Sequence, residues 1–265
     1  MGFLQEAFLQ NALAAALISG ALCAFLGVYV HLKRIIFIGI ALSEVAALGI
    51  AAGLYVGIWP EASASVLTVL VALFFWWPGR RGFLSREAVL GLVYCVAAAL
   101  GIILLAANPM AEAHGVDLVS GNLLYTMGDD ILVLGLLAIA TFGLHLFLFP
   151  RFLFVSFDPE TARTLGLEER TVEFLMYLTL GLCISVSMKT TGILFVFSSM
   201  VIPPMAGLVL CRRVWAVFVV SVVTSLAAAF LGLWASFVWD LPTGPAIVCA
   251  EGFLFLLIAL VRVLR

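Results

Sequence analysis

The sequence predicts an all-α, polytopic membrane protein with about nine transmembrane helices. Hydrophobic residues make up 65% of its 265 residues, well above the share of about 45–50% in typical globular proteins. Only 13 residues are Lys or Arg and 15 are Asp or Glu, and they cluster between long apolar runs. Because a spanning helix needs about 20 apolar residues, nine spans leave only short connections and no soluble catalytic domain.

The apolar runs define the expected elements in order along the chain. Irregular backbone is not tolerated against lipid, and the runs lack the alternating polarity of barrel strands, so we expect helices. The expected spans are residues 8–30, 35–58, 63–78, 88–107, 131–150, 171–188, 193–211, 214–238 and 245–262. A count of eight stays open if one run is re-entrant or split. Residues 1–265 are expected to form a single transmembrane domain.

The positions of Lys and Arg indicate how the spans are oriented. With nine spans and the amino terminus outside, twelve of the thirteen fall on the cytoplasmic side, as the positive-inside rule requires. These twelve are Lys33, Arg34, Arg80, Arg81, Arg86, Arg151, Arg163, Arg170, Arg212, Arg213, Arg262 and Arg265. We therefore expect the amino terminus outside and the carboxyl terminus in the cytoplasm, with Lys189 as the one exception.

Two connections are expected to carry structure of their own. Segment 108–130 is too polar to cross the membrane and too apolar for a free loop, which predicts an interfacial helix around 116–126. Residues 151–170 form the longest basic connection, where Asp158 is a good N-cap and Gly166 can end a helix in a left-handed cap. This pattern predicts a short helix at the cytoplasmic surface, either an ordinary interfacial turn or a docking helix for a soluble partner.

Polar residues inside the spans are candidates for a transport path. Glu44 lies about nine residues, or roughly 13 Å, into its span, where an acidic side chain costs about 2.5–3.5 kcal/mol. It is either a hydrogen-bonded structural residue or a cation ligand or gate. Pro203 and Pro204 interrupt the seventh span. Such a break either marks a transport path or is a tolerated kink. Lys189 either reaches water or pairs with Glu44 or Glu251, and Glu251 is expected to pack against a polar neighbour.

Several classes of function are excluded by the sequence. A net charge of -2 lacks the basic surface that nucleic-acid binding requires. Neither Lys33 nor Lys189 follows a glycine, so the phosphate-binding pattern G-x-x-x-x-G-K is absent and ATP would be hydrolysed by another subunit. The metalloprotease pattern H-E-x-x-H is also absent. We expect no catalytic residue and no cofactor in this chain.

Five stretches resemble the permease subunits of ABC importers for zinc, manganese and iron. They are LGVYVHLKRIIFIGIALSEVAALGIA at 26–51, SGNLLYTMGDDIL at 120–132, FDPETARTLGL at 157–167, KTTGILFVFSSMVIPPMAGLVL at 189–210 and DLPTGPAIV at 240–248. The resemblance implies a multi-pass permease in a bacterial plasma (inner) membrane. Its implied partners are ATP-binding subunits that use ATP, an extracytoplasmic substrate-binding protein and a second copy of the chain, in a homodimer within the lipid bilayer.

In that family, the segment FD-x-x-x-A-x-x-x-G resembles a coupling helix that fits a groove on the ATPase. The resemblance therefore implies a cytoplasmic coupling helix at 157–170. Its matching positions are Phe157, Asp158, Ala162 and Gly166. A surface helix between two spans can pass the closure of a partner subunit to both spans.

The second span resembles the G-D-A-L-S-H pattern of the metal-importing members. Residues 39–44 read GIALSE, so Ile40 replaces the Asp and Glu44 replaces the His of that metal-coordinating pair. Oxygen ligands favour manganese and other hard cations over zinc. The expected substrate pathway comprises Ser43, Glu44, Lys189, Pro203 and Pro204, with Glu44 as the metal ligand. Because both polar positions differ, a non-metal cargo stays open, as does a proton-coupled carrier with Glu44 as its proton site.

Overall fold

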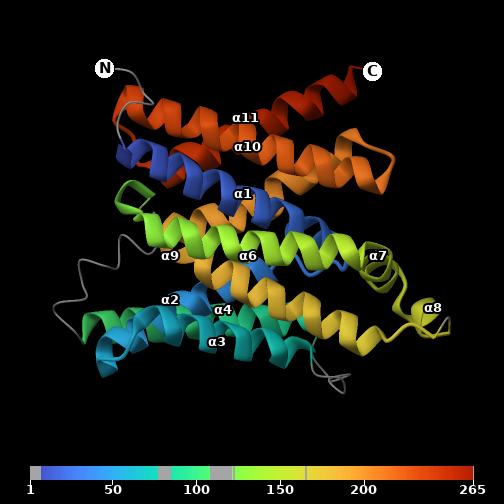
Figure 1. The fold of residues 1–265 in the computed structure, drawn as a ribbon, viewed down its shortest axis with the longest axis horizontal. Helices are drawn as coiled ribbons and strands as arrows, with labels where there is room; N and C mark the ends of the chain where they lie inside the picture. The colour runs from blue at the N-terminus through green and yellow to red at the C-terminus, as the bar shows by residue number, and fades with distance from the viewer. Residues whose placement is uncertain (1–6, 77–84, 108–120, 122, 165, 265) are drawn as a thin grey trace. The chain divides into compact units, whose positions relative to one another are not determined.

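Helices account for nearly all of the structure, a computed structural model that describes residues 7–76, 85–107, 121, 123–164 and 166–264 (Figure 1). The helices are α1 (Ala7–Leu32), α2 (Ile38–Val56), α3 (Pro60–Trp76), α4 (Arg86–Ala106), η1 (Leu123–Tyr125), α6 (Gly128–Phe147), α7 (Phe149–Phe157), α8 (Pro159–Thr164), α9 (Glu169–Leu210), α10 (Val214–Trp239) and α11 (Thr243–Val263). The predicted all-α, polytopic fold class is confirmed. Within the described ranges, seven helices are long and apolar enough to cross a membrane, and α3 is a shorter apolar helix.

The expected division between spans 171–188 and 193–211 coincides with a break in the structure. Both expected spans fall within α9, whose 42 residues comprise two helices joined at a kink. Only Gly192 leaves helical geometry, with φ 82° and ψ 167°. A single glycine, which tolerates a positive φ, thus takes the place of the loop that separate spans would require.

Close backbone packing surrounds this break in α9. Gly121 also has a positive φ, of 78°, and a Cβ added to it would lie 2.2 Å from the carbonyl oxygen of Thr191. The segment before α6 therefore rests directly on the backbone of the break. The predicted interfacial helix around 116–126 falls mostly outside the described residues, and η1 is the element described within it.

The chain forms two compact units. One consists of Met1–Val28, Ala113–Ala138 and Ser187–Arg265, and the other of Tyr29–Glu112 and Ile139–Val186. The boundaries fall inside α1, α6 and α9, so each of these helices contributes to both units. Every contact described below lies within one of the two units.

Small residues let neighbouring helices approach closely within each unit, as in other membrane proteins. In one unit α2 packs on α3 and α4, and a Cβ added to Gly49 of α2 would lie 2.5 Å from the Cα of Ala64 in α3. In the other unit α10 packs on α11, and a Cβ added to Gly232 would lie 2.4 Å from the Cα of Ile247. These contacts join backbone to backbone, so they leave no room for a larger side chain.

We predict that Gly232→Ala destabilises the protein because the added methyl group must push α10 and α11 apart. Overpacking of this kind costs about 1–3 kcal/mol. Gly252→Ala in α11 is the matched control, since a Cβ there meets no atom within 4 Å. Thermal unfolding of the purified protein in detergent should show a lower Tm for Gly232→Ala only. Equal Tm values for the two variants would contradict the close approach.

Candidate transport path and coupling segment

The start of α8 is fixed by the side chain of Asp158, as its N-cap pattern predicts. The Oδ1 atom of Asp158 accepts a hydrogen bond from the backbone N–H of Thr161 at 3.0 Å. Its Oδ2 atom accepts a second hydrogen bond from the Thr161 hydroxyl at 2.5 Å. An N-cap oxygen satisfies a backbone donor that the first turn of a helix leaves without a partner.

The end of α8 is closed by Gly166, which was expected to end it in a left-handed cap. Gly166 has φ 75°, its N–H donates to the carbonyl of Arg163 at 3.1 Å, and the N–H of Leu167 donates to the carbonyl of Ala162 at 3.1 Å. This pair of bonds is a Schellman motif, which needs a left-handed residue and therefore favours glycine. Because these two caps bracket it, the helix is six residues long within the segment 157–170.

The four residues that match the family's coupling motif have different environments. Phe157 ends α7 with 57% of its surface exposed, whereas Ala162 is fully buried. Asp158 and Gly166 shape the backbone, as described above. The segment is thus a short capped helix, and the exposed ring of Phe157 lies just before it in the chain.

An ion pair ties α8 to the first turn of α9. The Nη2 atom of Arg163 lies 2.6 Å from Oε2 of Glu169, and its Nε atom donates to the same oxygen at 2.9 Å. One turn further along α9, Glu173 pairs with Lys33, which follows the end of α1. No sequence pattern links Lys33 to Glu173, which lie 140 positions apart. Both ion pairs lie in the unit that contains α2, α3 and α4.

Glu44 lies in α2 on a face that is only partly buried. Ile40 and Glu44, one helical turn apart, are both half-buried, while Ser43 between them is buried. The Ser43 hydroxyl donates to the carbonyl of Gly39 in its own helix at 2.9 Å, so its proton is already used. Within the described ranges no three His, Cys, Asp or Glu side chains converge to hold a metal ion.

Lys189 pairs with Asp130 of α6 in the structure. Its Nζ lies 2.7 Å from Oδ1 of Asp130, and its side chain is 38% exposed. The Oδ2 atom of Asp130 also accepts the backbone N–H of Met127 at 3.1 Å. Glu251, one of the partners expected for Lys189, pairs with a different residue. It is fully buried, and its Oε1 accepts a hydrogen bond from the hydroxyl of Ser199 at 2.6 Å. The expectation that Glu251 packs against a polar neighbour is confirmed.

Pro203 and Pro204 are buried within α9. Pro204 has no N–H, so the carbonyl of Met200 has no helical partner. A Cβ added to Gly27 of α1 would lie 2.3 Å from that carbonyl oxygen. The α1 backbone therefore covers the freed carbonyl, and the proline pair supports close packing of α1 on α9 at this point.

A family model decides which class of protein this is. The model described as ABC 3 transport family matches residues 5–262, almost the whole chain.

The chain belongs to the ABC 3 transport family. It is accordingly a multi-pass membrane permease subunit of an ABC importer, which confirms the predictions that it transports and is not an enzyme.

Relatives of this ABC 3 permease have names that refer to three different metals. It is 30% identical over 256 residues to the "Chelated iron transport system membrane protein YfeD" of Yersinia pestis, covering 96% of this chain and 85% of the relative. It is 27% identical over 264 residues to the "Manganese transport system membrane protein MntC" of Halalkalibacterium halodurans, covering 96% and 87%. It is 25% identical over 246 residues to the "High-affinity zinc uptake system membrane protein ZnuB" of Haemophilus influenzae, covering 93% and 94%.

A solved structure has the same fold as the permease. The chain is similar to a chain of "PsaBC from Streptococcus pneumoniae in complex with Fab" with a TM-score of 0.86 and 22% identity, covering 97% of this chain and 92% of that one. At this level of identity the likeness establishes the fold alone.

We predict that Asp158→Ala loosens the coupling segment of the permease. Loss of an N-cap costs about 1 kcal/mol, so backbone amides in α8 should exchange with deuterium about fivefold faster. Thr161→Ala is the matched control, since it removes the hydroxyl bond to Asp158 but keeps the capping N–H. Hydrogen exchange that is unchanged in Asp158→Ala would show that Asp158 does not hold the helix.

Proposed function

We propose that this permease imports a divalent metal ion, namely manganese, iron or zinc, by ATP-driven alternating access. The observation that carries the proposal is family membership over residues 5–262, together with relatives named for these three metals that align with more than nine-tenths of the chain. Family membership implies a separate ATP-binding subunit and a substrate-binding protein as partners. The chain itself supplies the path and the surface on which the ATPase acts.

The proposed orientation has the amino terminus outside and the carboxyl terminus in the cytoplasm of the bacterial inner membrane. It follows from the clustering of Lys and Arg in alternate connections. The exception, Lys189, is paired with Asp130, an acidic residue of the connection that this orientation places outside. An exposed ion pair at the outer surface accounts for a lysine that the positive-inside pattern leaves unexplained.

Glu44 is proposed as the metal-contacting residue of the path. Its carboxylate lies deep in α2 on a half-buried face, and an oxygen ligand favours manganese or iron over zinc. One carboxylate is a weak site by itself. A two-fold homodimer would contribute a second Glu44, which is why we propose that two copies form the importer.

The remaining proposed pathway residues are Ser43, Lys189, Pro203 and Pro204. The Ser43 oxygen can still accept a bond although its proton is used by Gly39. The charge on Lys189 is balanced by Asp130, so it would repel an entering cation less than an unpaired lysine. The proline pair marks the point where α9 departs from regular hydrogen bonding.

The proposed coupling segment comprises Phe157, Asp158, Ala162 and Gly166. Its two caps make α8 a short rigid unit, and the Arg163–Glu169 ion pair connects that unit to α9. Closure of the ATP-binding subunits would move α8, and α9 would move with it because the two are joined by charge as well as by chain. This is how a surface helix can drive a change in membrane helices.

A non-metal cargo carried by the same architecture is the second candidate. It is favoured by Ile40, which cannot bind a metal, and by the single carboxylate at Glu44. A proton-coupled carrier that works without an ATPase is the third candidate, and its transport would persist when the ATP-binding subunit is absent.

We predict that Glu44→Gln lowers metal uptake by about tenfold or more, because an amide oxygen binds a divalent cation far more weakly than a carboxylate. Uptake of radiolabelled manganese, iron and zinc should be measured in cells that express the complete importer. Glu44→Asp, which keeps the charge, is the matched control and should retain most of the uptake. Unchanged uptake of all three metals in Glu44→Gln would remove Glu44 as the ligand and favour the non-metal cargo.

We predict that Phe157→Asp weakens assembly with the ATP-binding subunit, since a charge would replace the exposed ring at the entrance to α8. Arg151→Ala is the matched control, because this exposed residue of α7 lies outside the coupling motif. The co-purified ATPase should fall about tenfold for Phe157→Asp and little for Arg151→Ala. An intact complex with normal uptake in Phe157→Asp would rule out this docking surface.

A further inference from the structure

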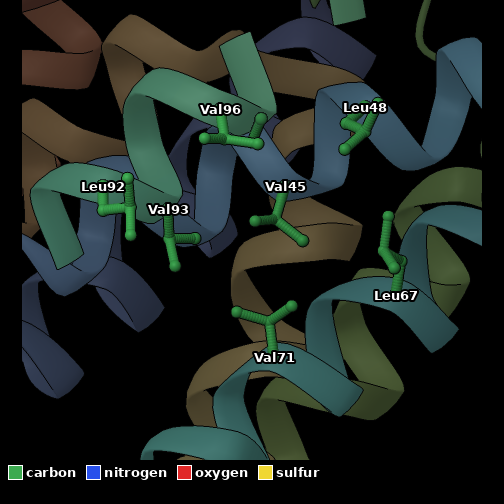
Figure 2. Close-up of a pocket in the computed structure, with 8 residues that line it drawn as sticks. Val45, Leu48, Leu67, Val71, Leu92, Val93 and Val96 are labelled. Carbon is green, nitrogen blue, oxygen red and sulfur yellow. The ribbon is translucent and has the colours of Figure 1, made fainter. Parts of the chain in front are cut away.

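An apolar groove lies among α2, α3 and α4, which pack together in one unit (Figure 2). Its volume is about 280 Å³, and its lining includes Val45 and Leu48 from α2, Leu67 and Val71 from α3, and Val93 and Val96 from α4. All of its lining side chains are aliphatic. Water would find no hydrogen-bond partner among them, so the groove favours an apolar occupant over water.

The groove is open along α4 rather than sealed within the unit. Leu92 and Val96, which line it, are 59% and 47% exposed. Because α4 has the length and hydropathy of a membrane span, its exposed side chains face acyl chains unless protein covers them. An acyl chain can therefore enter the groove from the side without crossing a polar surface.

The depth of the groove is the same on all three helices. Its lining residues lie about 5–11 residues from Ile38 at the start of α2, from Trp76 at the end of α3 and from Arg86 at the start of α4. At about 1.5 Å per residue this is roughly 7–16 Å below one end of the helices. Half of a bilayer core is about 15 Å thick. The groove therefore lies within a single leaflet, in the region that acyl chains occupy.

The end of the helices nearest the groove suits an anionic headgroup. Arg86 is exposed, and among the described residues it makes no ion pair, whereas Lys33 is held by Glu173. It is the first residue of α4, where the helix dipole favours a negative charge and where Glu87 already supplies one. The indole N–H of Trp76 donates to the carbonyl of Arg170 at 3.0 Å, which is typical of an aromatic side chain at headgroup depth.

We propose that this groove binds one acyl chain of an anionic phospholipid, whose phosphate is held at Arg86. In the orientation proposed above, the lipid belongs to the cytoplasmic leaflet. The volume is just below the range of about 300–1,000 Å³ that small-molecule sites occupy, so it suits a segment of one chain rather than a folded ligand. The phospholipid supplies what the two parts of the site require, an apolar tail in the groove and a negative charge at its rim.

The bound chain would lie beside the proposed metal path. Leu48 lines the groove and is one helical turn from Glu44 on the same face of α2. An acyl chain at Leu48 would fill the space between α2 and α4 and would exclude water from that side of the Glu44 carboxylate. Lipid occupancy is thus a means of setting the position of α2.

Native mass spectrometry of the full-length permease, purified and titrated with phosphatidylglycerol or phosphatidylcholine, tests the proposal. The wild type should retain phosphatidylglycerol about fivefold better than phosphatidylcholine, because one basic side chain near a membrane surface contributes about 1 kcal/mol. Arg86→Gln should abolish that preference. Val93→Trp, which fills the groove, should lose both lipids, and Leu92→Trp serves the same purpose at an already exposed position. Ile102→Trp is the control, since Ile102 lies on α4 with 68% exposure and does not line the groove.

Three results would overturn the proposal. Val93→Trp and Leu92→Trp could retain phosphatidylglycerol as the wild type does, or the wild type could retain both lipids equally. Alternatively, the groove-filling variants could lose a dimer mass instead of lipid adducts, which would assign the groove to a second copy of the chain. Because lipid adducts are counted without any transport assay, the result is independent of the cargo proposed for Glu44.

Discussion

The absence of water inside a bilayer is the constraint on which the rest of this structure depends. Every backbone donor and acceptor within the membrane must find a partner in the protein, so the described chain is helical almost throughout. Departures from helical bonding are few and closely covered. Gly192 breaks α9 where Gly121 packs on Thr191, and the carbonyl freed by Pro204 is covered by Gly27. Because Gly121 and Gly27 have no side chain, their backbone can lie directly against the backbone of α9.

Charged residues are placed where the same constraint permits them. The pair Arg163–Glu169 lies in the connection around α8, and Lys33–Glu173 joins the segment after α1 to the start of α9. A buried carboxyl such as Glu251 occurs with a hydroxyl donor beside it. Glu44 differs from these groups because its face of α2 is only half-buried. That difference is the physical basis for treating Glu44 as part of a path and Glu251 as part of the packing.

The proposed coupling segment depends both on contacts between residues close in the chain and on contacts between residues far apart in it. Asp158 and Gly166 act on backbone groups within five residues of themselves, so their roles as caps follow from sequence spacing. The mechanical connection from α8 to α9 and on to Lys33 requires side chains to meet across the unit. Nothing in the spacing of these residues along the sequence predicts that connection.

The sequence by itself determined the fold class, the approximate spans and the caps of α8. These properties depend on hydrophobicity and on interactions between residues close in the chain, which a linear pattern records. The tertiary structure alone decided that Gly192 is the one residue of α9 with non-helical geometry, that Lys189 meets Asp130, that Glu251 meets Ser199, and that α2, α3 and α4 leave an apolar groove. Each of these depends on which helices become neighbours, and that choice is set by the packing of side chains far apart in sequence.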